Sequence, residues 1–362
     1  MPTVAKATPL LELHQELGAK LTEFGGWDMP LQYEGTVSEH HAVRERAGLF
    51  DVSHLGKLLL EGPGAEGALQ RALTCDVAAI EVGAAKYALV LNDDAGCIDD
   101  VFLYRLAGDS WLVVPNASNT DAVADAIREA GGEPVDVWDR WAILALQGPR
   151  SFDVFTTVWP DSDAPSLALH RWAPLDLSGG DGIVARTGYT GERGFEIYAP
   201  AAVAVEVARK LLDAGAAPVG LGARDTLRLE MGYALYGHEI DAATDPLSAG
   251  LGWAVSWEQP FRGRDALAKI KADGPSKRLF GFKATDRGVP RQGYEVTQGD
   301  AVIGRVVSGN FSPSLQTGIA IAFAPADRWP EQGSEVAVQA RGRSVAGVVV
   351  RPPFVERGKK RN

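Results

Sequence analysis

The most constraining feature of this 362-residue chain is the segment Lys86 to Leu106, KYALVLNDDAGCIDDVFLYRL. Its alternating apolar runs around an acidic, Gly-containing turn predict two antiparallel strands. Side chains alternate between the two faces of a strand, so Asp100 should share a face with Phe102 and Tyr104, and Asp99 should point the other way. The segment therefore predicts a hairpin that carries an acid on an aromatic face.

Two interpretations of Asp100 follow from that position. A carboxylate on an aromatic face is desolvated, so its proton affinity rises and it needs a hydrogen-bond partner or a ligand with basic nitrogens. Alternatively, an Asp next to a turn often bonds the turn backbone. The segment leaves both interpretations open for Asp100 and favours the backbone role for Asp99.

Composition limits the class of protein. A net charge of -11, from 36 basic and 47 acidic residues, argues against a general nucleic-acid binder. No apolar run is long enough to span a membrane, and the first residues, MPTVAKATPL, lack a signal-peptide core, so we expect a cytoplasmic protein. Two cysteines, Cys75 and Cys97, fit a reducing compartment and offer no zinc site, and the six histidines show no metal-ligand spacing.

The order of predicted elements indicates a mixed α+β chain of two or three domains. Residues 8 to 50 predict two helices, the second over about Ser38 to Ala47 with Ser38 as a cap. From Asp51 to about Val137 the order strand, helix, hairpin, strand, helix resembles a ferredoxin-like unit. The chain after Gly274 has short β runs between Gly, Pro and Asp, which predict a small antiparallel barrel or sandwich.

The Gly-rich segment Arg186 to Tyr198, RTGYTGERGFEIY, predicts a second hairpin whose backbone can approach a flat ligand closely. On its outgoing strand, Glu196 should share a face with Tyr198. A carboxylate there matches an amino-pyrimidine edge through two parallel hydrogen bonds. A solvent-facing strand glutamate is the simpler interpretation of Glu196 taken alone.

The helix predicted over 223 to 232 places Arg224 and Arg228 one turn apart, a repulsive pair unless anions lie nearby. We expect Arg228 to form structural salt bridges with Asp225 or Glu230, and Arg224 to be better placed to reach a ligand. Trp253, in AGLGW, is either a core residue or a stacking wall, and the core is favoured. The spacing Gly62, Gly64, Gly67 matches GxGxxG, but the antiparallel hairpin that follows favours a plain turn over a nicotinamide site.

Seven segments together resemble aminomethyltransferase, the T-protein family of the glycine cleavage system, over nearly the whole chain. They are TPLLELHQELGAKLTEFGGWDMPLQY, GLFDVSHLGK, DDAGCIDDVFLYR, LALQGP, TGYTGERGFEIY, GLGARDTLRLEMGYALYGHEI and RVVSGNFSPSL. The resemblance implies a three-domain cloverleaf around a folate site. Its first domain would comprise residues 1–50 and 138–273, its ferredoxin-like domain 51–137, and its C-terminal β-barrel domain 274–362.

The resemblance also implies a reaction and a site. An aminomethyl group on the lipoyl arm of the H-protein would pass its one-carbon unit to tetrahydrofolate, forming 5,10-methylenetetrahydrofolate and releasing ammonia. The family's essential aspartate falls on Asp100, its pterin-facing glutamate on Glu196 and a folate-contacting arginine on Arg224. Further pocket positions fall on Tyr87, Asn116, Tyr189, Trp253 and Arg291. No metal, flavin or nicotinamide is implied, and the chain alone is expected to be a monomer.

The chain departs from the family pattern at one point, and one alternative function fits its residues. Some members carry a folate-contacting tyrosine after a PF segment, whereas Pro353-Phe354 is followed here by VERGKKRN. The alternative is a non-enzymatic folate-binding module of the iron-sulfur assembly type, which has a KGCYxGQE motif where this chain has DPLSAGLGW. The related dimethylglycine and sarcosine dehydrogenases need a flavin domain for which the chain has no room.

Overall fold

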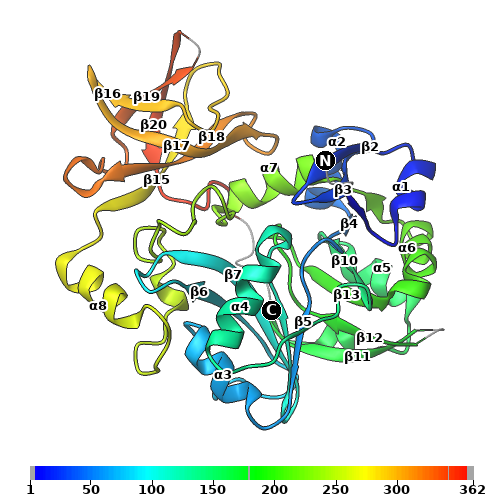
Figure 1. The fold of residues 1–362 in the computed structure, drawn as a ribbon. Helices are drawn as coiled ribbons and strands as arrows, with labels where there is room; N and C mark the ends of the chain where they lie inside the picture. The colour runs from blue at the N-terminus through cyan, green and yellow to red at the C-terminus, as the bar shows by residue number, and fades with distance from the viewer. Residues whose placement is uncertain (1–4, 178–179, 341, 357–362) are drawn as a thin grey trace.

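The computed structural model describes residues 5–177, 180–340 and 342–356, and its strands form four sheets (Figure 1). The smallest is three-stranded, in the order β1-β3-β2, and lies near the N-terminus. Its elements are β1 (Lys6–Ala7), β2 (Lys20–Phe24), β3 (Trp27–Gln32) and the neighbouring helix α1 (Leu11–Glu16). Strands β2 and β3 form an antiparallel hairpin.

A six-stranded sheet forms the centre of the first part of the chain, in the order β11-β12-β13-β10-β4-β14. Its strand β10 is buried on both faces, because Leu144 and Leu146 pack under the helices α5 and α6 while Ile143 and Ala145 pack on the opposite side. The elements are β4 (Gly48–Asp51), β10 (Trp141–Gln147), α5 (Ser151–Val158), β11 (Trp172–Leu177), β12 (Gly180–Ala185), β13 (Gly194–Pro200), α6 (Ala204–Asp213) and β14 (Ala217–Pro218).

A five-stranded antiparallel sheet carries the hairpin that contains Asp100, in the order β6-β7-β8-β5-β9. Helices α3 and α4 cover one face, where Val101 and Leu103 join their core, as the ferredoxin-like order predicts. The other face, with Tyr104 and Leu112, packs against the six-stranded sheet. The elements are β5 (Leu58–Glu61), α3 (Ala65–Ala72), β6 (Ala85–Leu91), β7 (Cys97–Ala107), β8 (Ser110–Val114), α4 (Thr120–Glu129) and β9 (Val135–Asp136).

The C-terminal part is a closed six-stranded antiparallel barrel. Of the two forms that the sequence predicted, a barrel or a sandwich, the barrel is therefore the correct one. Helix α7 passes between the barrel and the two larger sheets, and its Leu229 packs on Ile319 and Ile321 of the barrel (Figure 1). The barrel strands are β15 (Lys277–Ala284), β16 (Glu295–Gln298), β17 (Ala301–Ser312), β18 (Thr317–Pro325), β19 (Glu335–Ala340) and β20 (Arg343–Val350). Three helices outside the barrel complete the fold: α2 (Thr36–Glu45), α7 (Leu221–Met231) and α8 (Arg264–Asp273).

Two local expectations need correction. Helix α2 begins at Thr36, so Ser38 is not its cap; its hydroxyl instead donates to the carbonyl of Gly35 at 2.9 Å. The Gly-rich segment is not itself a hairpin, because its incoming strand β12 ends at Ala185 and residues 186–193 form the connecting loop. In that loop Gly191 has a φ of +79°, a conformation that glycine adopts at no steric cost.

The remaining predicted elements lie where the sequence places them, and Gly62 to Gly67 lead from β5 directly into α3. The strand after α3 enters an antiparallel hairpin, as expected for a plain strand-to-helix turn. Within the described residues, no helix combines the length and the apolar character that a membrane crossing requires.

Candidate active site

Two polar side chains hold the carboxylate of Asp100 on β7. The hydroxyl of Tyr87, on the neighbouring strand β6, donates to Asp100 Oδ2 at 3.1 Å, and Asn116 Nδ2 donates to Asp100 Oδ1 at 2.8 Å. Burial raises the pKa of Asp100, and these two hydrogen bonds to the ionised form oppose that rise. Tyr87 and Asn116 therefore orient the half-buried carboxylate of Asp100, and bonding to the turn backbone is not its role.

Asp99 points to the opposite face, as the strand alternation predicts, but its role differs from the expected turn contact. It is fully buried and accepts hydrogen bonds from the backbone N–H of Asn116 at 2.8 Å, from Asn116 Nδ2 at 2.8 Å and from Asn119 Nδ2 at 2.7 Å. Burial and the nearby Asp100 charge raise the pKa of Asp99 to about 7. Asp99 therefore anchors the loop that follows β8.

A row of aromatic rings crosses the hairpin beside Asp100. Trp253 stacks on Tyr87 with ring centroids 5.2 Å apart, Tyr87 meets Phe102 at 5.9 Å, and Phe102 meets His170 at 5.7 Å. Trp253 is 69% exposed, so the expectation of a core residue is wrong and a stacking wall is what the fold provides. His170, with a φ of +61°, had no distinguishing signal in the sequence.

Glu196 is buried at 9% exposure on β13, which excludes the solvent-facing interpretation. The hydroxyl of Thr187 donates to Glu196 Oε2, a partner that the sequence analysis did not single out. Burial raises the pKa of Glu196, while the Thr187 hydrogen bond and the positive charge of Arg224 act in the opposite direction. A carboxylate in such a setting accepts charge-assisted hydrogen bonds from a ligand strongly.

Arg224, on the first turns of α7, lies over the ring of Tyr189 with its guanidinium carbon 4.8 Å from the centroid. The Tyr189 hydroxyl donates to the carbonyl of Ala234, and its ring stacks on Tyr233 at 5.7 Å. Burial raises the pKa of Tyr189; the charge of Asp100 raises it further and that of Arg224 lowers it. Tyr189 therefore lies close enough to both Asp100 and Arg224 for their charges to influence its pKa.

The remaining basic residues have other surroundings. Arg228 is buried and pairs with Asp225 at 2.8 Å and with Glu239 at 3.1 Å, the structural role expected of it. The other expected partner, Glu230, pairs with Arg44 instead. Arg291, on the exposed rim of the barrel, donates to Asn310 at 2.9 Å. Within the described part of the chain, no hydrogen bond, ion pair or ring contact joins Arg291 to the other candidate residues.

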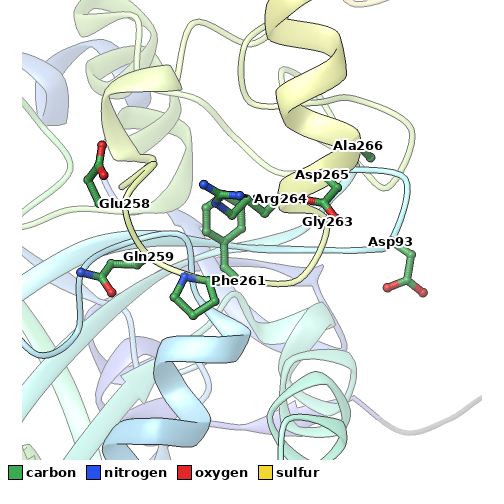
Figure 2. A pocket seen from close by; sticks show the side chains of 9 residues that line it. Asp93, Glu258, Gln259, Phe261, Gly263, Arg264, Asp265 and Ala266 are labelled. Carbon is green, nitrogen blue, oxygen red and sulfur yellow. Dashed lines mark ion pairs between the residues drawn. The ribbon is translucent and has the colours of Figure 1, made fainter.

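A surface depression of about 580 Å³ lies away from these candidates, between the tip of the β6–β7 hairpin and the start of α8 (Figure 2). None of the candidate residues lines it. Its lining comprises Asp93, Glu258, Gln259, Pro260, Phe261, Gly263, Arg264, Asp265 and Ala266. The candidate site is therefore defined by the contacts of Asp100, Glu196 and Arg224.

Comparison with known proteins gives a consistent result over the whole chain. The family model for the GCVT N-terminal domain matches residues 10–259, and that for the glycine cleavage T-protein C-terminal barrel domain matches residues 277–356. An aminomethyltransferase of Halothermothrix orenii is 44% identical over 358 residues, covering 97% of this chain and 100% of the relative. One of Mycobacterium tuberculosis is 47% identical over 355 residues, covering 96% of each chain.

The structural comparison agrees. The crystal structure of glycine cleavage system aminomethyltransferase T from Bartonella henselae has a TM-score of 0.91 and 36% sequence identity, covering 97% of this chain and 98% of that one. Sequence and fold thus match one family from the first helix to the last strands of the barrel. The chain belongs to the aminomethyltransferases, the T-protein family of the glycine cleavage system.

Proposed function

We propose that this chain transfers a one-carbon unit from the aminomethylated lipoyl arm of an H-protein to tetrahydrofolate. In this reaction the carbon loses its bonds to the lipoyl sulfur and to nitrogen, and it gains bonds to N5 and N10 of the folate. Ammonia and the free dihydrolipoyl thiol leave, and 5,10-methylenetetrahydrofolate forms. Membership of the aminomethyltransferase family supports the reaction type.

The observation that carries this proposal is the environment of Asp100. Its carboxylate is half-buried on an aromatic face, and Tyr87 and Asn116 fix both of its oxygens. An ionised carboxylate so held can accept a hydrogen bond from the attacking folate nitrogen. It also stabilises the positive charge that develops as the carbon is transferred. We therefore assign Asp100 as the catalytic residue of the transfer.

The folate itself would be held by the residues around Asp100. Glu196 would accept two parallel hydrogen bonds from the amino-pyrimidine edge, and Arg224 would reach a carbonyl or carboxylate of the same ligand. Tyr87, Tyr189 and the exposed face of Trp253 offer aromatic surface to a flat ring. Asn116 would act through Asp100, and the exposed Arg291 suits the acidic tail of the folate.

The same proposal covers the organisation of the protein. We divide the chain into a first domain of residues 1–50 and 138–273, a second domain of 51–137 and a barrel domain of 274–362, arranged as a cloverleaf. The proposed partner is the lipoylated H-protein, and the chain alone would be a monomer. Cys75 and Cys97 are both free and buried, which fits the proposed cytoplasmic setting.

Turnover distinguishes this proposal from a non-enzymatic folate-binding module, which the family comparisons do not favour. The purified chain would be mixed with aminomethylated H-protein and tetrahydrofolate, and methylenetetrahydrofolate and ammonia would be measured. We expect one ammonia per methylene group formed, and no product when free glycine replaces the H-protein. Folate binding without turnover would instead support the non-enzymatic module.

A further inference from the structure

The side-chain amide of Asn116 lies between the two carboxylates of the hairpin. Its nitrogen is 2.8 Å from Asp99 Oδ1 and 2.8 Å from Asp100 Oδ1, so each of its two hydrogens has an acceptor. Its backbone N–H donates to Asp99 Oδ2 at 2.8 Å. Asp99 therefore holds Asn116 at two points, and Asn116 presents its second hydrogen to Asp100.

Asp99 is suited to this task because three donors reach its two oxygens, and the ionised form of a carboxylate uses both oxygens only as acceptors. All its contacts are with donors, the third being Asn119 Nδ2 at 2.7 Å. Throughout residues 5–177, 180–340 and 342–356, no salt bridge to Asp99 is found. A fully buried acid without a cation is costly, so a residue of this kind needs a reason to be acidic that packing alone does not supply.

We propose that Asp99 is a positioning residue of the transfer reaction: it fixes Asn116, and Asn116 fixes the orientation of Asp100. This inference rests on the proposed function, since it gives Asp99 a part in the same chemistry. Asp99 does not touch the reacting atoms, because it points to the face covered by α3 and α4. Asp99 affects the site only because it holds the Asn116 amide in place.

Replacing Asp99 by asparagine tests the relay. The NH₂ group of the new asparagine has to face either the backbone N–H of Asn116 or the side-chain amides of Asn116 and Asn119. In both orientations two hydrogen-bond donors meet, so we expect the Asn116 side chain to move away. Asp100 then loses one of its two partners. We expect kcat to fall by about tenfold or more, the loss typical of a hydrogen bond to a charged group. The Kd for tetrahydrofolate should change by less than about threefold, because Asp99 faces away from the ligand.

Asn119→Ala is the matched control. Asn119 donates to the same oxygen of Asp99, and within the described residues it makes no contact with Asp100. This variant should lose thermal stability while keeping kcat within about twofold of the unchanged protein. If Asp99→Asn folds poorly, Asp99→Ser removes acceptor oxygens without adding an NH₂ group, and its kcat should also fall with Kd retained. Unchanged kcat in a folded Asp99 variant would overturn the proposal.

A crystal structure of Asp99→Asn or Asp99→Ser provides a readout that does not depend on activity. We expect the Asn116 amide to be displaced from Asp100 Oδ1 in both variants. An Asn116–Asp100 hydrogen bond kept at its present length would overturn the relay even if kcat fell. If the unchanged protein showed no turnover with aminomethylated H-protein, the proposed function would fail, and this structural test would still decide whether Asp99 positions Asn116.

Discussion

At the scale of single residues, the site depends on carboxylates that the fold keeps from water. Asp100 and Glu196 both have a raised pKa because burial penalises their charged forms, and each receives a hydroxyl hydrogen bond that opposes this. The donor to Asp100 is Tyr87, and the donor to Glu196 is Thr187. Such acids interact strongly with a ligand that offers N–H groups, because burial limits the competition of solvent for their oxygens.

Asp100→Asn keeps the size of the side chain and removes its charge. We expect turnover to fall on the order of 10²-fold, because the charge that stabilises the developing cation is lost. Folate affinity should change far less, as for an interaction made mainly in the transition state. Asp94→Asn, in the exposed turn of the same hairpin, is the control and should keep full turnover. Steady-state rates and folate titrations of both variants would check this; a fall in affinity with kcat retained would contradict it.

Glu196→Ala and Arg224→Ala should weaken tetrahydrofolate binding by about one to two decades, the value of a charge-assisted hydrogen bond. Both variants remove polar contacts more than core volume, so their unfolding transitions should remain cooperative. Glu206→Ala, an exposed residue of α6 paired with Lys210, controls for the loss of a carboxylate elsewhere. Calorimetric titration measures each affinity, and values equal to that of the unchanged protein in both site variants would remove these residues from the folate site.

At the scale of elements, α7 is joined to both α2 and the barrel through Glu230. This fully buried carboxylate accepts from Arg44 of α2 at 2.8 Å, from Ser312 at the end of β17 at 2.6 Å and from Ser314 at 3.0 Å. The hydrogen bonds and charges of His40 and Arg44 lower the pKa of Glu230 to about 2, against the effect of burial. One glutamate thus ties α2 and the barrel to the helix that carries Arg224.

Glu230→Gln should lower the free energy of unfolding at pH 7 by roughly 3 kcal/mol, the equivalent of the Glu230 pKa shift. Its folded pKa lies below its ordinary value of 4.5, so its contribution is complete above about pH 5 and is lost as the pH falls toward 2. The stability gap between the two proteins should therefore narrow over that range. Urea unfolding at several pH values checks this. A gap that stays constant down to pH 2.5 would show that the charge of Glu230 is not the cause.

At the scale of the whole molecule, the tip of the β6–β7 hairpin is fixed by a loop 150 residues later in the sequence. Asn92 Nδ2 donates to the carbonyl of Ala242 at 2.9 Å, and the backbone N–H of Cys97 donates to the carbonyl of Thr244 at 3.0 Å. Gly96 allows this approach, because a Cβ there would lie 1.9 Å from the Ala242 oxygen. The position of Asp100 therefore depends on a contact between distant segments.

Gly96→Ala should push the hairpin away from residues 241–244 and cost at least about 2 kcal/mol of stability, as overpacking of a close backbone contact does. Because the hairpin carries Asp100, we also expect lower turnover at temperatures where the protein stays folded. Gly108→Ala, at the β7–β8 turn, is the matched control, since its Cβ would meet open space. Equal unfolding midpoints for the two variants would show that the hairpin tip tolerates a shift.

The sequence by itself determined those features that repeat along a single segment. The alternation along Cys97–Ala107 predicted which face carries Asp100, and that along Gly194–Pro200 predicted that Glu196 and Tyr198 share a face. Turn residues and short β runs likewise predicted an antiparallel barrel or sandwich at the C-terminus and the approximate extent of most helices. These features follow from side-chain periodicity, which acts between neighbours in the chain.

Only the tertiary structure decided which groups hydrogen-bond to these residues or stack on them. Asp99 was expected to hydrogen-bond to the backbone of its own turn, yet its donors lie on the loop after β8. Trp253 was expected in the core, yet it is exposed on the ring of Tyr87, and Thr187 gave no signal as the partner of Glu196. Burial and hydrogen bonding depend on which distant segments meet, and that is set by the packing of sheets and loops, which the local pattern of residues does not encode.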